Sequence, residues 1–130
     1  MIKWFERYSW IALVISLAIA VFIFYISSLT FGSGGGNGSN LKAMTYHVFI
    51  YLLFSFFLCV ALVKGKYPKL VFFALLISVI YGISDEIHQF FVPGRYLSGF
   101  DIFLDSLGTL AGALIYVVYS ENASLKKKRN

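Results

Sequence analysis

The sequence predicts an all-α integral membrane protein: four transmembrane helices in one bundle, with both termini in the cytoplasm. Three observations predict this class, namely an apolar composition, four apolar runs, and basic residues concentrated on one side of those runs. Of the 130 residues, 59% are hydrophobic and 13% are charged, and the mean hydropathy is +0.80, whereas soluble domains are about 25% charged. The length fits a single membrane domain over residues 1–130.

The first two spans are expected at residues 10–31 and 43–63. The first contains 22 residues without a charge, and as a helix it would extend about 33 Å across a hydrocarbon core of about 30 Å. Basic and aromatic residues before it indicate an anchor at the membrane interface. The Gly- and Ser-rich residues 32–40 predict a flexible loop between the two spans.

The second span carries a polar stripe. His47, Tyr51 and Ser55 recur every four residues, so on a helix they share one face. Polar side chains on a transmembrane helix avoid lipid, and this face is therefore expected to contact protein or water. The short KGKYPK connection that follows predicts a tight turn between antiparallel helices.

The third span is expected at residues 70–92. Its uncharged part, residues 70–84, would reach only about 22 Å as a helix, which is too short to cross the membrane. The helix must therefore continue through Asp85 and Glu86 to a point just before Pro93.

The last span is expected at residues 102–119. On this helix Asp101, Asp105, Gly108 and Gly112 share one face. The two glycines, four residues apart, predict the close approach of a neighbouring backbone.

Lysine and arginine counts predict the orientation of the four spans. Nine of these residues lie at the amino terminus, in the turn between the second and third spans, and in the tail after the last span. Only Lys42 and Arg95 lie on the opposite side. The positive-inside rule therefore places both termini in the cytoplasm. The net charge of +5 reflects this topology, and no basic-aromatic surface outside the spans indicates nucleic-acid binding.

This topology gathers ionisable residues into one layer near the outer ends of three spans. Ionisable groups inside a membrane are costly, so such a layer needs partners, water or a function. Four carboxylates face two cations, which leaves two negative charges uncompensated unless a proton, a metal ion or a cationic ligand is present. The layer comprises Lys42, His47, Asp85, Glu86, His88, Gln89, Arg95, Asp101 and Asp105.

Two motifs in this layer resemble the VanZ-like family, small bacterial membrane proteins named after a teicoplanin-resistance determinant. They are Lys42-x4-His47-x3-Tyr51 and the segment D-E-x-x-Q-x-F-x-P-G-R over residues 85–95, followed by Asp101 and a glycine-bearing helix. Asp105 departs from the pattern, in which this position is often Asn. The resemblance implies a multi-pass protein of the bacterial plasma membrane that acts in glycopeptide resistance or in the cell envelope, and it implies no established reaction.

Three interpretations of the layer remain open at this stage. In the first, Arg95 and Lys42 pair with carboxylates and only lock the helix ends. In the second, which we favour, an outer-leaflet pocket binds or modifies a lipid-linked envelope component, with Arg95 gripping a phosphate and Glu86 or His47 moving a proton. The third is a metal site built on the i, i+3 pair Asp85 and His88, with further ligands within reach from among His47, Glu86, Asp101 and Asp105.

The favoured interpretation assigns specific roles. Candidate catalytic residues are Glu86, His47 and Asp85, and candidate binding residues are Lys42, Tyr51, Gln89, Arg95, Asp101 and Asp105. The expected partners are a membrane lipid or lipid-linked envelope precursor and, through the resemblance, a glycopeptide antibiotic. No cofactor, metal or nucleic acid is expected, since the chain has no metalloprotease-type or repeated Glu-x-x-His signature. His88 by itself is expected to pack at the interface.

Overall fold

A computed structural model of the protein describes the backbone of residues 2–30 and 37–129 and the side chains of residues 4–30 and 41–125. The described residues form four long helices and a short one at the amino terminus. In chain order the helices are α1 (Ile2–Arg7), α2 (Ser9–Ser27), α3 (Asn37–Val63), α4 (Leu70–Phe90) and α5 (Gly99–Arg129). The described residues contain no strand. Helices α2 to α5 are each long and apolar enough to cross a membrane, which confirms the all-α class and the number of spans.

The observed helix bounds differ from the predicted ones in ways that local chemistry explains. Helix α2 ends at Ser27 instead of reaching residue 31. Helix α3 begins at Asn37, so the predicted loop over residues 32–40 is wrong for its last four positions, where Asn and Ser suit a helix start. The rest of that loop lies outside the described residues. Helix α5 runs well past the predicted end at residue 119.

Helix α4 confirms the argument from length. It extends through both acidic residues to Phe90, two residues short of the predicted end. At its other end, Lys64 and Gly65 adopt positive φ angles of 53° and 62° in the turn from α3. This turn reverses the chain within six residues, as predicted.

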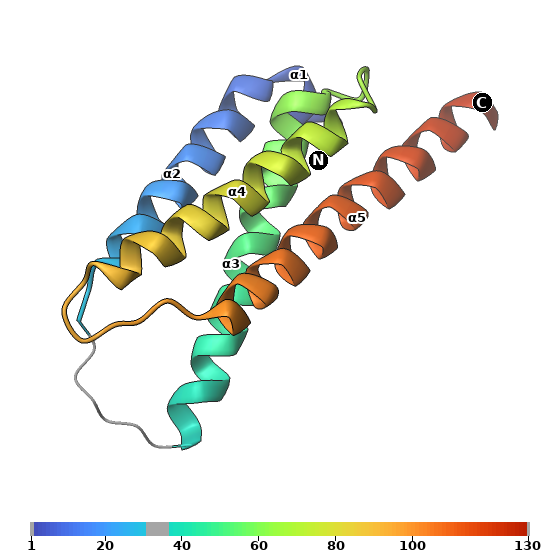
Figure 1. Cartoon of the computed structure of the whole chain (residues 1–130). Coiled ribbons are helices and arrows are strands. Elements are labelled where there is room, and N and C mark those ends of the chain that lie inside the picture. Colours follow the sequence, from blue (N-terminus) through green and yellow to red (C-terminus); the bar gives the residue numbers. More distant parts are fainter. Residues whose placement is uncertain (1, 31–36, 130) are drawn as a thin grey trace.

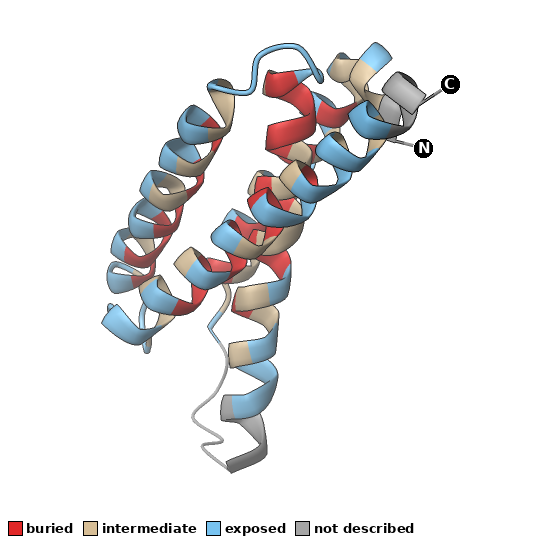
Figure 2. Ribbon diagram, turned by 90° about the vertical axis from the view of Figure 1, so that its right-hand side faces the viewer, coloured by how far each residue is buried: buried red, intermediate tan, exposed pale blue. Residues whose placement is uncertain are grey.

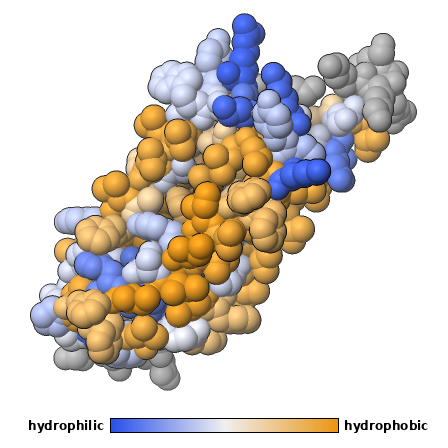
Figure 3. Space-filling model, turned by 45° about the horizontal axis from the view of Figure 1, so that its top comes forward, coloured by the Kyte–Doolittle hydropathy of each residue, from blue (hydrophilic) through white to orange (hydrophobic). Residues whose placement is uncertain are grey.

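The outer surface of the bundle is apolar where it would contact lipid. Large hydrophobic side chains such as Val21, Phe72 and Leu114 are more than half exposed, and Figure 2 shows that buried residues form stripes on the inward sides of the helices. In Figure 3 a hydrophobic band crosses the middle of the molecule, and hydrophilic residues gather toward its two ends. This distribution is the one that a bilayer requires.

Helix α3 lies at the centre of the bundle. In its most apolar stretch 56% of the residues are buried, compared with 17% for α2, 28% for α4 and 39% for α5. The most extensive helix contact joins α3 to α5, which crosses it in Figure 1. The polar stripe of α3 faces protein as expected, because His47, Tyr51 and Ser55 are at most 6% exposed.

Two glycines bring α5 against the α3 backbone. A Cβ atom at Gly108 would lie 2.3 Å from the carbonyl oxygen of Val48, and one at Gly112 would lie 2.3 Å from that of Leu52. Only glycine fits at such distances. The predicted close approach is therefore confirmed, and its partner is α3.

Candidate functional site

The carboxyl end of α4 carries three buried polar side chains. Asp85, Glu86 and Gln89 are 5%, 0% and 3% exposed. The Gln89 amide Nε2 donates to Asp85 Oδ2 at 2.9 Å and to Glu86 Oε1 at 3.0 Å. One amide therefore holds two carboxylates that point to different sides of the helix.

Asp85 and Arg95 fasten this end of α4 to the end of α2. Ser27 Oγ donates to Asp85 Oδ1 at 2.6 Å. Arg95 Nη1 lies 3.3 to 3.4 Å from the carbonyl oxygens of Ile26, Ser27 and Leu29, to which it donates. A cation at these last carbonyls also meets the negative end of the α2 dipole. A structural role for Arg95 was one of the open interpretations, but the α2 carbonyl groups as its partners were not anticipated.

Glu86 holds the start of α5. Its Oε2 atom accepts a hydrogen bond from the backbone N–H of Ser98 at 3.0 Å. The Ser98 hydroxyl in turn accepts from the backbone N–H of Asp101 at 3.2 Å, which is the bond expected of a helix N-cap. The loop between α4 and α5 is consequently positioned by a carboxylate at the core of the bundle.

His47 and Asp105 join α3 to α5 in the same layer. His47 Nδ1 and Asp105 Oδ1 are 2.8 Å apart, and both side chains are buried. The glycine contact one turn along α5 makes this short distance possible. Among the described residues, neither Asp105 Oδ2 nor the hydroxyl of Tyr51 has a hydrogen-bond partner.

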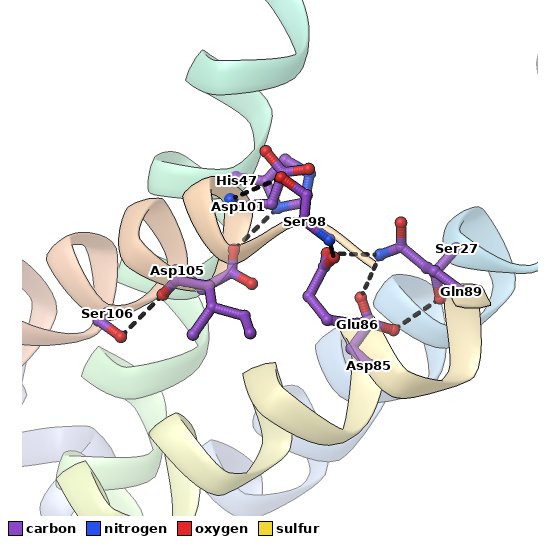
Figure 4. Close-up of polar contacts among 10 residues, drawn as sticks. Ser27, His47, Asp85, Glu86, Gln89, Ser98, Asp101, Asp105 and Ser106 are labelled. Carbon is purple, nitrogen blue, oxygen red and sulfur yellow. Dashed lines mark hydrogen bonds and ion pairs between the residues drawn. The ribbon is translucent and has the colours of Figure 1, made fainter. Parts of the chain in front are cut away.

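Three side chains from three helices converge at this point. His47 of α3, Glu86 of α4 and Asp105 of α5 are all buried, and each offers one potential ligand atom within 4.8 Å of the others. Figure 4 shows them around a shared space, with the α4–α5 loop beside them. We call these three residues the buried triad. Nitrogen and carboxylate oxygen atoms so placed can exchange a proton or bind a cation.

A pocket of about 430 Å³ lies at this end of the bundle. Its polar lining includes Gln89, Arg95, Ser98 and Asp101. Gln89 and Ser98 are the two residues that donate to Glu86. Two residues that line the pocket therefore contact the buried triad directly, through their hydrogen bonds to Glu86.

The fold and these motifs agree with the comparison to known families. A family model described as VanZ/LLP1 matches residues 3–120. The chain belongs to the VanZ/LLP1 family. Neither a curated protein nor a solved structure matches the chain. The matched region contains all the predicted site residues of this VanZ/LLP1 protein.

The structure brings most of the predicted site residues together. Three of them form the buried triad, Asp85 and Gln89 adjoin it, Tyr51 is buried near Asp105 beside Gly82, and Arg95 and Asp101 line the pocket. Lys42 is exposed and does not line the pocket.

The alternative in which Asp85 and His88 pair as metal ligands does not match the contacts of these two side chains in this VanZ/LLP1 structure. His88 Nε2 lies 2.9 Å from Ser28 Oγ, and its ring stacks on Phe24 at 4.3 Å between centroids. Asp85 is held by Ser27 and Gln89. The expectation that His88 is a packing residue is supported by these contacts.

Two residues of the site were missed by the sequence analysis. Ser98 begins an S-x-x-D pattern with Asp101, a helix-start signal that was available in the sequence. Ser27 carried no comparable signal, because a lone serine near the end of an apolar span has no distinguishing spacing.

Proposed function

We propose that this VanZ/LLP1 protein acts at the outer face of the bacterial plasma membrane, where its pocket binds the polar head group of a lipid-linked envelope component. Through this binding it reduces susceptibility to teicoplanin-type glycopeptides. The observation that carries the proposal is the pocket of about 430 Å³ at the end of the bundle where the carboxylates gather. Pockets for small ligands typically measure about 300 to 1,000 Å³.

The position of the pocket favours a lipid as the source of its ligand. Its lining comes from the start of α3, the end of α4, the α4–α5 loop and the start of α5, at the end of the bundle opposite the Lys-rich turn. A lipid could keep its chains beside the exposed apolar side chains of the helices while its head group enters the pocket. The nine-to-two distribution of Lys and Arg supports an orientation with this end outside the cytoplasm.

The chemistry of the lining favours a head group with a phosphate and hydroxyls. Arg95 supplies guanidinium donors for phosphate oxygens. Asp101 and the carbonyl oxygen of Gln89 can accept hydrogen bonds from sugar hydroxyls. Tyr96 and Phe100, which also line the pocket, offer aromatic faces to a sugar ring.

A purely structural layer accounts for less of the site. It explains why Ser27, Gln89 and Ser98 bond to the carboxylates. It does not explain the polar pocket above them, nor a buried carboxylate oxygen on Asp105 without a partner among the described residues. Burying a carboxylate oxygen without a hydrogen-bond partner destabilises the fold. Proteins retain such destabilising groups most often at functional sites.

Chemical modification of the bound component is a second candidate function. It is favoured by the position of Glu86 and His47 behind the pocket wall, because these are the residue types that transfer protons. Asp85 is tied to Ser27 and Gln89 and is less suited to that role.

The proposal is tested by lipid binding in nanodiscs with a polyprenyl phosphate that carries a sugar as the probe. We expect native mass spectrometry to detect the bound probe on the wild-type protein. Asp101→Asn and Arg95→Lys should each weaken binding roughly tenfold, since each removes a directed polar contact. The matched controls Glu121→Gln and Arg7→Lys lie at the opposite end of the bundle and should leave binding unchanged.

Susceptibility to teicoplanin, measured at matched expression, should rise in the variants that lose binding. Thermal melts of the same samples separate the two explanations. If binding falls and susceptibility rises only in variants that also melt earlier, the layer is structural and the proposal is wrong.

A further inference from the structure

We propose that the buried triad of His47, Glu86 and Asp105 is a binding site for a divalent transition-metal ion. This inference goes beyond the proposed function and does not depend on it. The three residues come from three helices, and their potential ligand atoms lie within 4.8 Å of one another. Small side-chain rotations bring such atoms to the separation of roughly 3.4 Å found between tetrahedral ligands at bond lengths of about 2.1 Å.

An unpaired oxygen provides independent evidence for a ligand. Asp105 is only 2% exposed, and its Oδ2 atom has no hydrogen-bond partner among the described residues. In Figure 4 this oxygen lies on the side of the carboxylate that faces Glu86. A cation in that space would satisfy an atom that is otherwise costly to bury.

Charge balance also favours a cation. Two carboxylates and a neutral imidazole carry a charge that one dication cancels, and the nearby Lys42 is exposed. Binding of the ion replaces the proton shared by His47 and Asp105, because metal ligands must be deprotonated.

The neighbouring contacts hold the triad in a suitable arrangement. Both oxygens of Glu86 accept hydrogen bonds, from Gln89 Nε2 and from the backbone N–H of Ser98, and such bonds orient ligands and tune metal sites. One imidazole with two carboxylates favours ions such as zinc or manganese over calcium and magnesium, which prefer oxygen alone. Three protein ligands also leave the ion with an open coordination position.

The test is metal stoichiometry on the detergent-purified full chain, stripped with a chelator, loaded with zinc or manganese and desalted. We expect elemental analysis to find about one ion per chain. Glu86→Gln, Asp105→Asn and His47→Ala should each lower affinity at least about tenfold. Asp101→Asn, which removes a charge near the triad but no ligand, is the matched control and should retain the ion.

Two results would overturn the proposal. One is folded wild-type protein that retains far less than one ion per chain. The other is an equal loss of metal in Asp101→Asn and Asp105→Asn, which would indicate attraction by diffuse negative charge. Misfolding of a triad variant would also lose the metal, so cobalt absorption of the folded wild type gives a separate readout. Cobalt bands displaced by zinc support the site, and their absence refutes it.

Discussion

Replacing Gly108 by alanine should separate α3 from α5 and open the buried triad. The added Cβ atom would lie 2.3 Å from the Val48 carbonyl oxygen, whereas ordinary contacts begin at 3.4 Å. The two backbones must therefore move apart by about 1 Å. The distance between His47 Nδ1 and Asp105 Oδ1, now 2.8 Å, would then exceed the limit for a good hydrogen bond.

The expected loss of stability combines two effects. Overpacking a close interface costs about 1 to 3 kcal/mol, and losing a hydrogen bond to a charged group costs about 1.5 kcal/mol or more. We therefore expect Gly108→Ala to lower the free energy of unfolding by roughly 2.5 to 4.5 kcal/mol. Unfolding in mixed detergent micelles, followed by circular dichroism, measures this change.

Gly99 offers a matched control at the start of the same helix. A Cβ atom there meets nothing within 4 Å, so Gly99→Ala should change stability by no more than about 0.5 kcal/mol. If Gly108→Ala has the same free energy of unfolding as the wild type, or if both variants lose the same stability, the close approach of α3 and α5 does not hold the layer together.

Three further predictions concern topology and the ends of the helices. On intact cells an impermeant thiol reagent should label Tyr96→Cys, at a site 79% exposed, but not Lys66→Cys, since the charge distribution places the two on opposite sides; the reverse pattern contradicts the topology. Arg95→Lys should destabilise the protein by about 1 to 2 kcal/mol, because an ammonium group cannot reproduce the contacts of the guanidinium with the α2 carbonyls, and an unchanged melting temperature would argue against that role. Tyr81→Phe removes the 2.6 Å hydrogen bond to the Ala20 carbonyl and should cost about 1 kcal/mol without affecting lipid or metal binding, measured as above.

The length of α4 shows what a sequence can predict about a membrane protein. Fifteen uncharged residues cannot cross a bilayer as a helix, so the acidic residues after them had to be helical, and they are. The same reasoning from depth placed the polar residues of three spans in one layer. Hydrocarbon thickness is an external constraint that does not depend on how the helices pack.

The end of α2 was mispredicted because the sequence near it remains apolar. The apolar run continues to residue 31, but the helix ends at Ser27. There the Ser27 hydroxyl donates to Asp85, and the Ser27 carbonyl oxygen accepts from Arg95. These partners are 58 and 68 residues away in the chain. Local composition therefore does not contain the signal that ends this helix.

The sequence by itself determined the fold class, the number of spans, the polar faces of the second and last spans and the family motifs, since these follow from composition, periodicity and spacing within single segments. Only the tertiary structure decided which faces meet. His47 and Asp105 are 58 residues apart, and periodicity gives each a face without naming the helix opposite. The close approach of α3 and α5, set by Gly108 and Gly112, brings these two side chains into contact. The packing of α4 then places Glu86 beside them. Such packing depends on the shapes of helices that are far apart in the sequence, so no single segment determines it.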